Sequence, residues 1–230
     1  MSIQFPLQFE FQANKGFDSF YPGSYPDIIE ALHQLVSGAG ERQIFLYGSK
    51  GYGKSHLLQA SCQLAHQQGI NSFYYSFDRR KLPTLDMFEG LEQMELVCFD
   101  DVDEISGLLD WEQAFLNFFE QHLENNHRLV VTALVHPNEL EIKLPDLRQH
   151  LLEGLTLKLK PQADEESVSA LIYKASHIGL TITPKVGHFL LSHYASDLPS
   201  LWILLEQLDK ATLSAQRKLT IPFLKQIMEN

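Results

Sequence analysis

The chain of 230 residues has few cysteines, no long apolar run and no excess of positive charge. Its only cysteines, Cys62 and Cys98, fall in an expected helix and an expected strand, which favours buried thiols in a reducing compartment. No apolar run approaches the roughly 18 residues that a membrane span needs. The N-terminus has neither the basic leader nor the cleavage site of a signal peptide. We therefore expect a cytoplasmic protein with no membrane partner.

The charge balance argues against one class of partner. The chain carries 18 Lys and Arg against 29 Asp and Glu, a formal net charge of −11. Tight, sequence-independent binding of nucleic acid needs a basic surface, and only Arg79, Arg80 and Lys81 form a local basic group. Protein partners are therefore expected in place of direct DNA binding.

Short apolar runs alternate with segments of helical period along most of the chain. This alternation is typical of a parallel sheet covered by helices, so we expect an α/β fold. Strands are expected at 43–47, 72–77, 95–99, 128–133 and 155–159. Helices are expected at about 28–36, 54–68 and 111–124.

The pattern changes near Pro161, beyond which no strand is indicated. Three acids at 164–166 suit the first turn of a helix, where the helix dipole favours negative charge. Thr183-Pro184 reads as an N-cap followed by proline at the first helical position. Two further helices are expected at 200–213 and 222–228, which predicts a small all-helical domain at the end of the chain.

A phosphate-binding loop carries the strongest functional signal. Residues Gly48 to Ser55 match the pattern G-x-x-x-x-G-K-[ST] in full, after an expected strand and at the start of an expected helix. Glycines let backbone N–H groups approach phosphates, Lys54 supplies a charge, and Ser55 offers a hydroxyl to Mg²⁺. The alternative is a glycine-rich turn, which would match by chance in about 1% of such chains. The residues expected to bind nucleotide here are Gly48, Gly51, Tyr52, Gly53, Lys54, Ser55 and His56.

A second expected strand ends in two acids, Asp100 and Asp101. An acid at the carboxyl end of a buried strand parallel to the phosphate-loop strand is suited to hold magnesium. We expect Ser55 and Asp100 to hold Mg²⁺ and Asp101 to orient water. The alternative is a polar strand end that begins a turn.

These features, with a strand ending in Thr132 and a helical tail, resemble the AAA+ ATPases and more narrowly the DnaA/Hda family. The segments that carry the resemblance are FDSFYPG at 17–23, KSHLL at 54–58, LVC at 96–98, LPDL at 144–147 and AQRKLTIPF at 215–223. The resemblance implies a RecA-like P-loop AAA+ domain with a parallel sheet, followed by a helical lid. It divides the chain into an N-terminal segment at 1–12, a base domain at 13–161 and the lid at 162–230.

The resemblance also implies ligands and partners. The family binds ADP or ATP with Mg²⁺, so Tyr21 is expected near the adenine and Thr132 near the catalytic centre. Its Hda members dock on the DNA polymerase sliding clamp, reach DNA only through it, and promote hydrolysis of ATP bound to DnaA. The clamp would be gripped by Gln4, Leu7 and Phe9, although the same alternation also suits an edge strand. A homodimer is left open, and the family's separate DNA-binding domain has no expected counterpart.

The departures from the family pattern concern hydrolysis. The trans-acting arginine finger should fall at His150, and the nearest arginine is Arg148; either alignment is open. A neutral imidazole cannot replace a permanent, forked cation. Pro199 and Leu134 stand where the family presents further polar residues. We therefore expect weak or absent ATPase activity of the chain's own, with an autonomous AAA+ ATPase or loader and a nucleotide-indifferent scaffold as alternatives.

Overall fold

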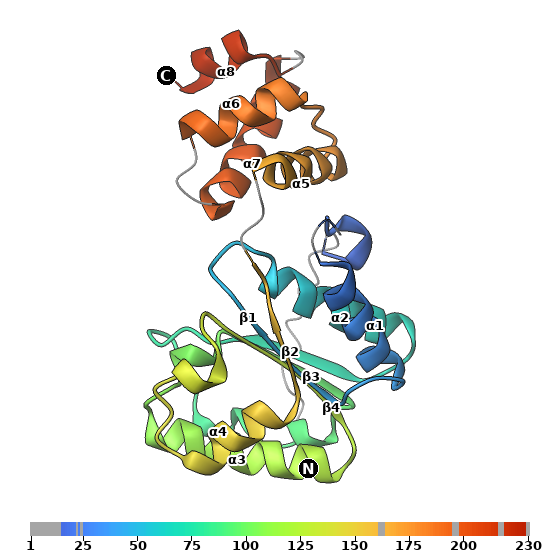
Figure 1. Cartoon of the computed structure of the whole chain (residues 1–230), viewed down its shortest axis with the longest axis vertical. Helices are drawn as coiled ribbons and strands as arrows, with labels where there is room; N and C mark the ends of the chain where they lie inside the picture. Colours follow the sequence, from blue (N-terminus) through green and yellow to red (C-terminus); the bar gives the residue numbers. More distant parts are fainter. Residues whose placement is uncertain are drawn as a thin grey trace.

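The computed structural model describes residues 15–21, 23, 25–160, 164–194, 198–215 and 219–228. Figure 1 shows two parts, a base domain built around a sheet and a purely helical lid above it. The sheet has five strands, β1 (Gln43–Tyr47), β2 (Ser72–Ser76), β3 (Leu96–Asp100), β4 (Arg128–Ala133) and β5 (Leu155–Lys158).

All pairings in the sheet are parallel, and the strand order is β2-β3-β4-β1-β5. The five predicted strands are confirmed to within two residues at each end. Strand β3 extends one residue further than predicted, so Asp100 is its last residue and pairs in register with Ser76. Because β4 lies between β1 and β3, the ends of these three strands meet at one edge of the sheet.

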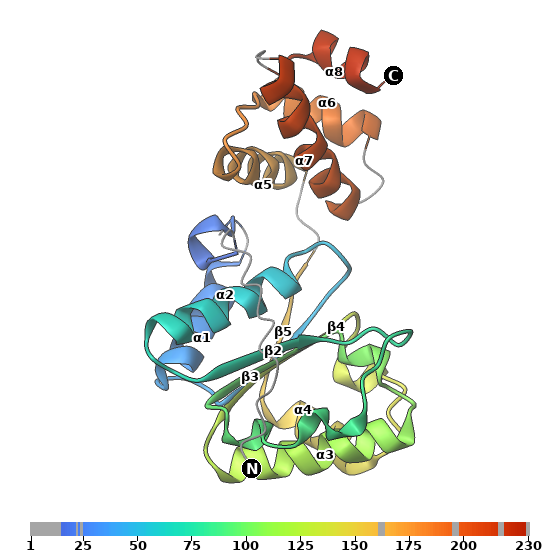
Figure 2. The same ribbon diagram turned by 180° about the vertical axis from the view of Figure 1, so that it is seen from behind.

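Helices cover both faces of the sheet. Figures 1 and 2 show α1 (Pro26–Ser37) and α2 (Lys54–Gln67) on one face, and α3 (Leu109–Glu124) and α4 (Pro145–Glu153) on the other. One buried core lies on each side of the sheet, and β3 is buried along its whole length. Five short 3-10 helices occupy the connections: η1 (Phe17–Ser19), η2 (Leu85–Phe88), η3 (Leu91–Gln93), η4 (Val102–Glu104) and η5 (Pro137–Glu139).

The lid consists of α5 (Asp164–His177), α6 (Pro184–Tyr194), α7 (Leu198–Ala215) and α8 (Ile221–Met228). The predicted cap of α6 is confirmed, since the backbone N–H of Val186 donates to Oγ1 of Thr183 at 3.4 Å. The lid has its own core, in which Leu190, Leu208 and Leu224 are wholly buried. The lid therefore has an apolar core separate from those of the base domain.

Hydrogen bonds join the lid and its connection to the base domain. The Tyr25 hydroxyl donates to the Lys160 carbonyl at 2.5 Å, and the Tyr173 hydroxyl of α5 donates to the Asp18 carbonyl. Nε1 of Trp202 in α7 donates to the Gly51 carbonyl in the phosphate loop at 3.5 Å. The phosphate loop therefore lies at the junction of the two parts.

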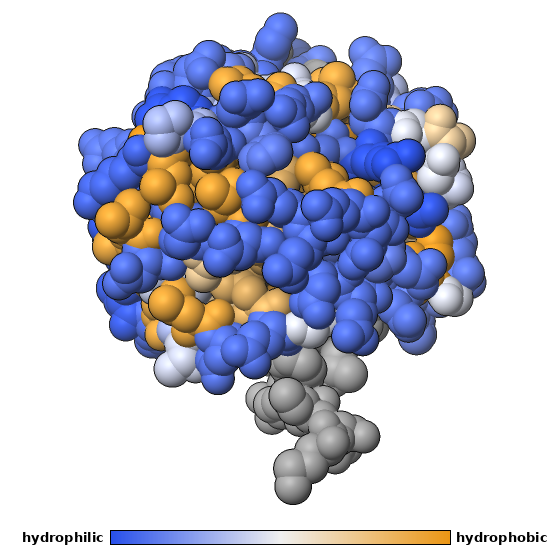
Figure 3. All heavy atoms as spheres, turned by 90° about the horizontal axis from the view of Figure 1, so that it is seen from below, coloured by the Kyte–Doolittle hydropathy of each residue, from blue (hydrophilic) through white to orange (hydrophobic). Residues whose placement is uncertain are grey.

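The lower face of the base domain, formed by α3 and α4, is hydrophilic with apolar groups gathered in places (Figure 3). Leu109 at the start of α3 is 51% exposed and Leu152 in α4 is 37% exposed. Both cysteines are free and buried, as predicted. Among the described helices, none combines the length and apolarity that a membrane span requires.

Candidate functional site: a pocket between the phosphate loop and the lid

Two glycines of the phosphate loop are required by close contacts. Gly53 has φ +96°, and a Cβ placed there would lie 2.4 Å from Cε2 of Phe20. A Cβ on Gly48 would lie 2.5 Å from the Leu159 carbonyl oxygen, which is backbone and cannot move aside. Glycine is therefore needed at both positions for the loop to pass under Phe20 and over the end of β5.

Lys54 begins α2 and is almost wholly buried. Its Nζ donates to the Gly48 carbonyl at 2.7 Å and to the Ser49 carbonyl at 3.2 Å. Burial lowers the pKa of this ammonium, and the nearby carboxylates of Asp101 and Asp100 act in the opposite direction. The lysine thus lies inside the curve of the loop, where the N-terminal end of α2 also favours an anion.

Asp100 and Asp101 have different surroundings. Asp100 is completely buried, and its carboxylate accepts hydrogen bonds from the Tyr74 hydroxyl at 3.0 Å and from the Thr132 hydroxyl. The Asp101 backbone, with φ +57°, donates to Oγ1 of Thr132 at 3.0 Å. Burial, and then the charge of Asp100, raises the pKa of Asp101 to about 6. Thr132 therefore ties the acidic end of β3 to β4.

A pocket of about 400 Å³ lies between the loop and the lid. Loop residues 50–55 line it together with Asp101. Its other lining residues are mostly aromatic or cationic. These residues are Lys15, Ser19, Phe20, Tyr21, Tyr25, His56, Ala170, Lys174 and Trp202. A site with this many lysines and aromatic rings suits a ligand that has both negative charge and a flat ring.

His56 is fixed by the segment before α1. Its Nε2 lies 2.9 Å from the Gly16 carbonyl and 3.2 Å from Oγ of Ser19. Burial lowers the pKa of His56 to about 4, with smaller contributions from nearby lysines. The imidazole is therefore neutral at pH 7 and shapes the pocket without adding charge.

The pocket contains most of the residues predicted to bind nucleotide. Those that line it are Tyr21, Gly51, Tyr52, Gly53, Lys54, Ser55 and His56, whereas Gly48, the first residue of the loop, does not. Of the two predicted acids, Asp101 lines the pocket and Asp100 does not. Sequence reasoning missed Lys50, Lys174 and Trp202 as pocket residues. Lys50 was visible at a variable position of the loop motif, but no motif marks the two lid residues.

Arg148 and His150 on α4 lie outside this pocket. The Arg148 guanidinium donates to the Ile142 carbonyl at 2.6 Å and to the Asn138 carbonyl at 3.1 Å. His150 lies 3.0 Å from Oε2 of Glu153 and stacks on Phe119, with ring centroids 5.3 Å apart. Gln4, Leu7 and Phe9 lie outside the described residues.

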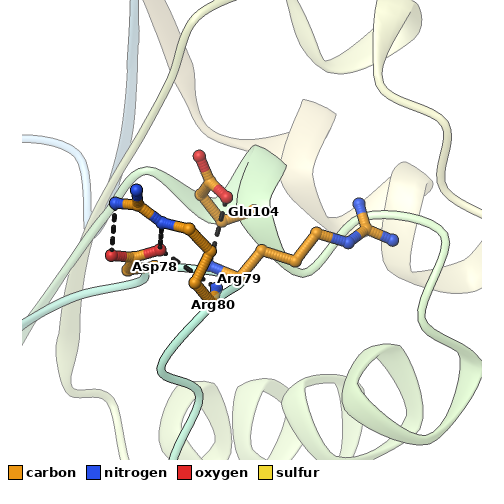
Figure 4. Close-up of polar contacts among 4 residues, drawn as sticks. All are labelled: Asp78, Arg79, Arg80 and Glu104. Carbon is orange, nitrogen blue, oxygen red and sulfur yellow. Dashed lines mark hydrogen bonds and ion pairs between the residues drawn. The ribbon is translucent and has the colours of Figure 1, made fainter.

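The local basic group is partly neutralised within the chain. Arg80 forms an ion pair with Asp78 at 2.9 Å. Hydrogen bonds from the side chain and the backbone N–H of Arg80 lower the pKa of the Asp78 carboxyl to about 2. The Arg79 backbone N–H donates to Oε2 of Glu104 at 3.1 Å, while its side chain extends away from the Asp78–Arg80 pair (Figure 4). This loop therefore offers less free positive charge than its sequence suggests.

Two protein families match this chain. The model of the bacterial DnaA ATPase domain matches residues 11–158. The model of the Hda lid domain matches residues 164–228.

Solved structures with the same fold include three replication initiation proteins. Domain III of the DnaA protein from Thermotoga maritima superimposes with a TM-score of 0.77 at 18% identity, covering 91% of this chain and 93% of that one. AMPPCP-bound DnaA from Aquifex aeolicus superimposes with a TM-score of 0.71 at 20% identity, covering 82% of this chain and 63% of that one. A DNA replication initiation factor superimposes with a TM-score of 0.70 at 19% identity, covering 85% of this chain and 64% of that one. The chain thus spans slightly less than two thirds of the last two proteins, and these similarities establish the RecA-like AAA+ fold.

Proposed function

Because the chain belongs to the DnaA/Hda family of AAA+ proteins, we propose that it is a regulator of replication initiation controlled by ADP or ATP. One observation carries the proposal most strongly. The phosphate loop, Asp101 and the lid enclose a single pocket whose lysines and aromatic rings match the phosphates and the base of a nucleotide.

The residues of the pocket, together with Asp100, which precedes Asp101 in the chain, fit a nucleotide with magnesium. Lys54 and the N–H groups that open α2 would hold the phosphates, and Tyr21 would contact the adenine. Ser55 offers a hydroxyl from the pocket wall, and Asp100 is held rigidly by Tyr74 and Thr132 one residue from the pocket. These two would hold Mg²⁺, which supplies neutralising charge to the phosphates. Asp101 would orient water.

Calorimetry with ADP and ATP tests this proposal. We expect binding of both nucleotides by the wild-type protein and a loss of at least tenfold in affinity in Lys54→Ala, because a charge-assisted contact contributes about 1.5–3 kcal/mol. Lys185→Ala, which removes an exposed lysine of α6, is the matched control and should bind normally. A wild-type protein that binds neither nucleotide would favour the nucleotide-indifferent scaffold.

The finer role we propose is that of the Hda members of the family. The N-terminal segment would dock on the sliding clamp through Gln4, Leu7 and Phe9, so that DNA is reached only through the clamp. From there the protein would promote hydrolysis of ATP bound to DnaA in the cytoplasm. Replacing Leu7 and Phe9 together by Ala should abolish retention on immobilised clamp, and unchanged retention would contradict clamp docking.

Helix α4 provides the second half of this test, because it carries both candidate finger positions. Arginine fingers contribute roughly 10³–10⁵ in rate. Arg148 already donates to two loop carbonyls, so we expect Arg148→Ala to act mainly through stability. Restoring a guanidinium with His150→Arg should raise clamp-dependent hydrolysis of DnaA-bound ATP. A selective loss of hydrolysis in a folded Arg148→Ala variant would instead identify Arg148 as the finger.

An autonomous ATPase is the second candidate, favoured by the presence of Lys54 and Asp101 in the same pocket. Steady turnover by the isolated protein, above that of the Lys54→Ala variant, would support it. We expect turnover no higher than that control.

A further inference from the structure

The lid side of the pocket is formed by residues that no phosphate-loop motif identifies. Ala170 and Lys174 lie one turn apart on α5, so both face the pocket from the same side of the helix. Trp202 of α7 completes this wall. The lid therefore contributes an ammonium group and a large aromatic ring to the site.

Trp202 connects that ammonium group to the phosphate loop. The Lys174 Nζ lies 4.6 Å from the centroid of the Trp202 ring, within the range of a cation–π contact. On its other side, the Trp202 Nε1–H donates to the Gly51 carbonyl at 3.5 Å. The same ring thus orients Lys174 and touches the loop that would bind phosphates.

Lys174 lines the same pocket as the first turn of α2. Its charge acts on His56, which follows Ser55 directly in the first turn of α2, in addition to the effect of burial on that histidine. The first turn of α2 is where a phosphate would lie. The aromatic side chains Phe20, Tyr21 and Tyr25, which also line the pocket, come from the segment before α1, and Phe20 lies edge-on to His56 with ring centroids 5.3 Å apart.

We propose that Lys174, oriented by the ring of Trp202, binds the phosphate chain of the nucleotide. Lys174 would thereby be the lid residue that makes the pocket prefer a nucleotide to a nucleoside without phosphate. This inference rests on the proposed nucleotide binding. A nucleotide phosphate offers the ammonium a full negative charge, which is a stronger partner than an aromatic face. Phosphate binding by Lys174 would couple the lid directly to the ligand, with Trp202 as the positioning residue.

Affinities of Lys174 variants for ADP and for adenosine test the proposal. We expect Lys174→Met to weaken ADP binding about tenfold or more. The affinity for adenosine should not change, because adenosine has no phosphate. Lys174→Arg keeps the charge and should retain most of the affinity. Lys185→Met on α6 is the control for loss of a lid lysine. Thermal unfolding without nucleotide identifies any variant that fails to fold. If Lys174→Met is such a variant, the ADP and adenosine affinities of Lys174→Arg are compared with those of the wild type instead.

The tryptophan gives a second, independent readout. The chain has two tryptophans, and Trp111 packs on Phe77 and Phe88 beneath the sheet, away from the pocket. In a Trp111→Phe background the fluorescence of Trp202 should change on titration with ADP, and Lys174→Met should reduce that change.

Equal ADP affinity of Lys174→Met and Lys185→Met, in a protein whose wild type binds ADP, would overturn this inference and leave the proposed function intact. Equal losses for ADP and adenosine would also overturn it, since they would indicate a general structural effect. Absence of ADP binding in the wild type would instead overturn the proposed function itself.

Discussion

Gly53 shows how one residue links the backbone of the phosphate loop to the aromatic wall of the pocket. Its φ of +96° is strained for any L side chain, and a Cβ would meet the Phe20 ring at 2.4 Å. We expect Gly53→Ala to destabilise the protein by about 2 kcal/mol or more, from the left-handed backbone and the displaced ring. Nucleotide affinity should fall as well, measured by calorimetry alongside urea unfolding.

Gly69 provides the matched control for this substitution. It has φ +74°, and a Cβ there would meet nothing within 4 Å. Gly69→Ala should therefore cost only the backbone term, about 1–2 kcal/mol, with unchanged nucleotide affinity. Equal behaviour of the two variants would show that the Phe20 contact has no influence on the pocket.

His122 makes stability depend on pH. It is wholly buried in α3, its Nε2 lies 2.9 Å from the Arg128 carbonyl, and burial lowers its pKa to about 4. Between pH 6.5 and pH 4 the unfolded chain therefore binds a proton that the folded protein excludes. Stability from this residue falls as the pH falls through that window, by roughly 1 kcal/mol per pH unit. Urea unfolding from pH 7 to pH 5 should show a shallower pH dependence in His122→Gln, and identical slopes would contradict this assignment.

At the scale of elements, a buried carboxylate joins α3 to the start of α4. Glu112 is 1% exposed, and its carboxylate accepts from the backbone N–H groups of Gly107 at 2.7 Å, Lys143 at 2.8 Å and Leu144 at 3.0 Å. In Glu112→Gln one oxygen becomes an NH₂ group, which leaves at least one backbone donor unpaired. We expect a loss of about 1–3 kcal/mol in the free energy of unfolding, with faster amide exchange at Lys143 and Leu144. Glu124→Gln, at an exposed position of the same helix, should change neither quantity.

Some of these elements could be predicted from the sequence, and the reason is physical. Strands buried on both faces require uninterrupted apolar runs, and β1, β3 and β4 appear in the sequence as such runs. Helix α4 was not predicted, because only Leu147 and Leu151 among its residues are buried. Its position depends on Glu112, which is distant in sequence and leaves no local periodic signal.

The candidate site was predictable to a similar extent. A loop that must wrap a phosphate is confined to one short segment, so Gly51, Gly53 and Lys54 could be recognised together. The two acids could be located and given different roles, but which of them lines the pocket could not be predicted, because the Asp101 backbone is held by Thr132 from β4. Lys174 and Trp202 are brought to the pocket only by the arrangement of the lid, which no local pattern records.

At the scale of the whole molecule, the pocket exists only while the lid stays against the base domain. The described contacts across this junction include hydrogen bonds from Tyr173 and Trp202 and a ring contact between Tyr21 and Tyr173, whereas each part has its own apolar core. Because the lid and the base domain have separate cores, a ligand that contacts both sides of the junction can bias the orientation of the lid. Adenine nucleotide would thereby control the surface that the protein presents to a partner.

The Tyr173 hydroxyl is the most direct way to test this control. Tyr173→Phe removes the donor to the Asp18 carbonyl and keeps the ring that packs on Tyr21, with centroids 5.7 Å apart. We expect both cores to remain stable, since one such hydrogen bond contributes only about 0.5–1.5 kcal/mol, but the lid to sample a wider range of orientations. Because Cys62 and Cys98 are buried, spin labels on cysteines introduced at the exposed positions Asp27 and Lys185 would report that range. The distance distribution should broaden in Tyr173→Phe and narrow when ADP is added.

Tyr75→Phe, which removes a hydroxyl from β2, is the control and should leave the distribution unchanged. If Tyr173→Phe and the wild type gave the same width with and without ADP, the Tyr173 hydrogen bond would not restrict the orientation of the lid. The nucleotide would then not change the orientation of the lid through this junction. Its effect on a partner would have to act within the base domain, from Asp101 through Thr132 to β4.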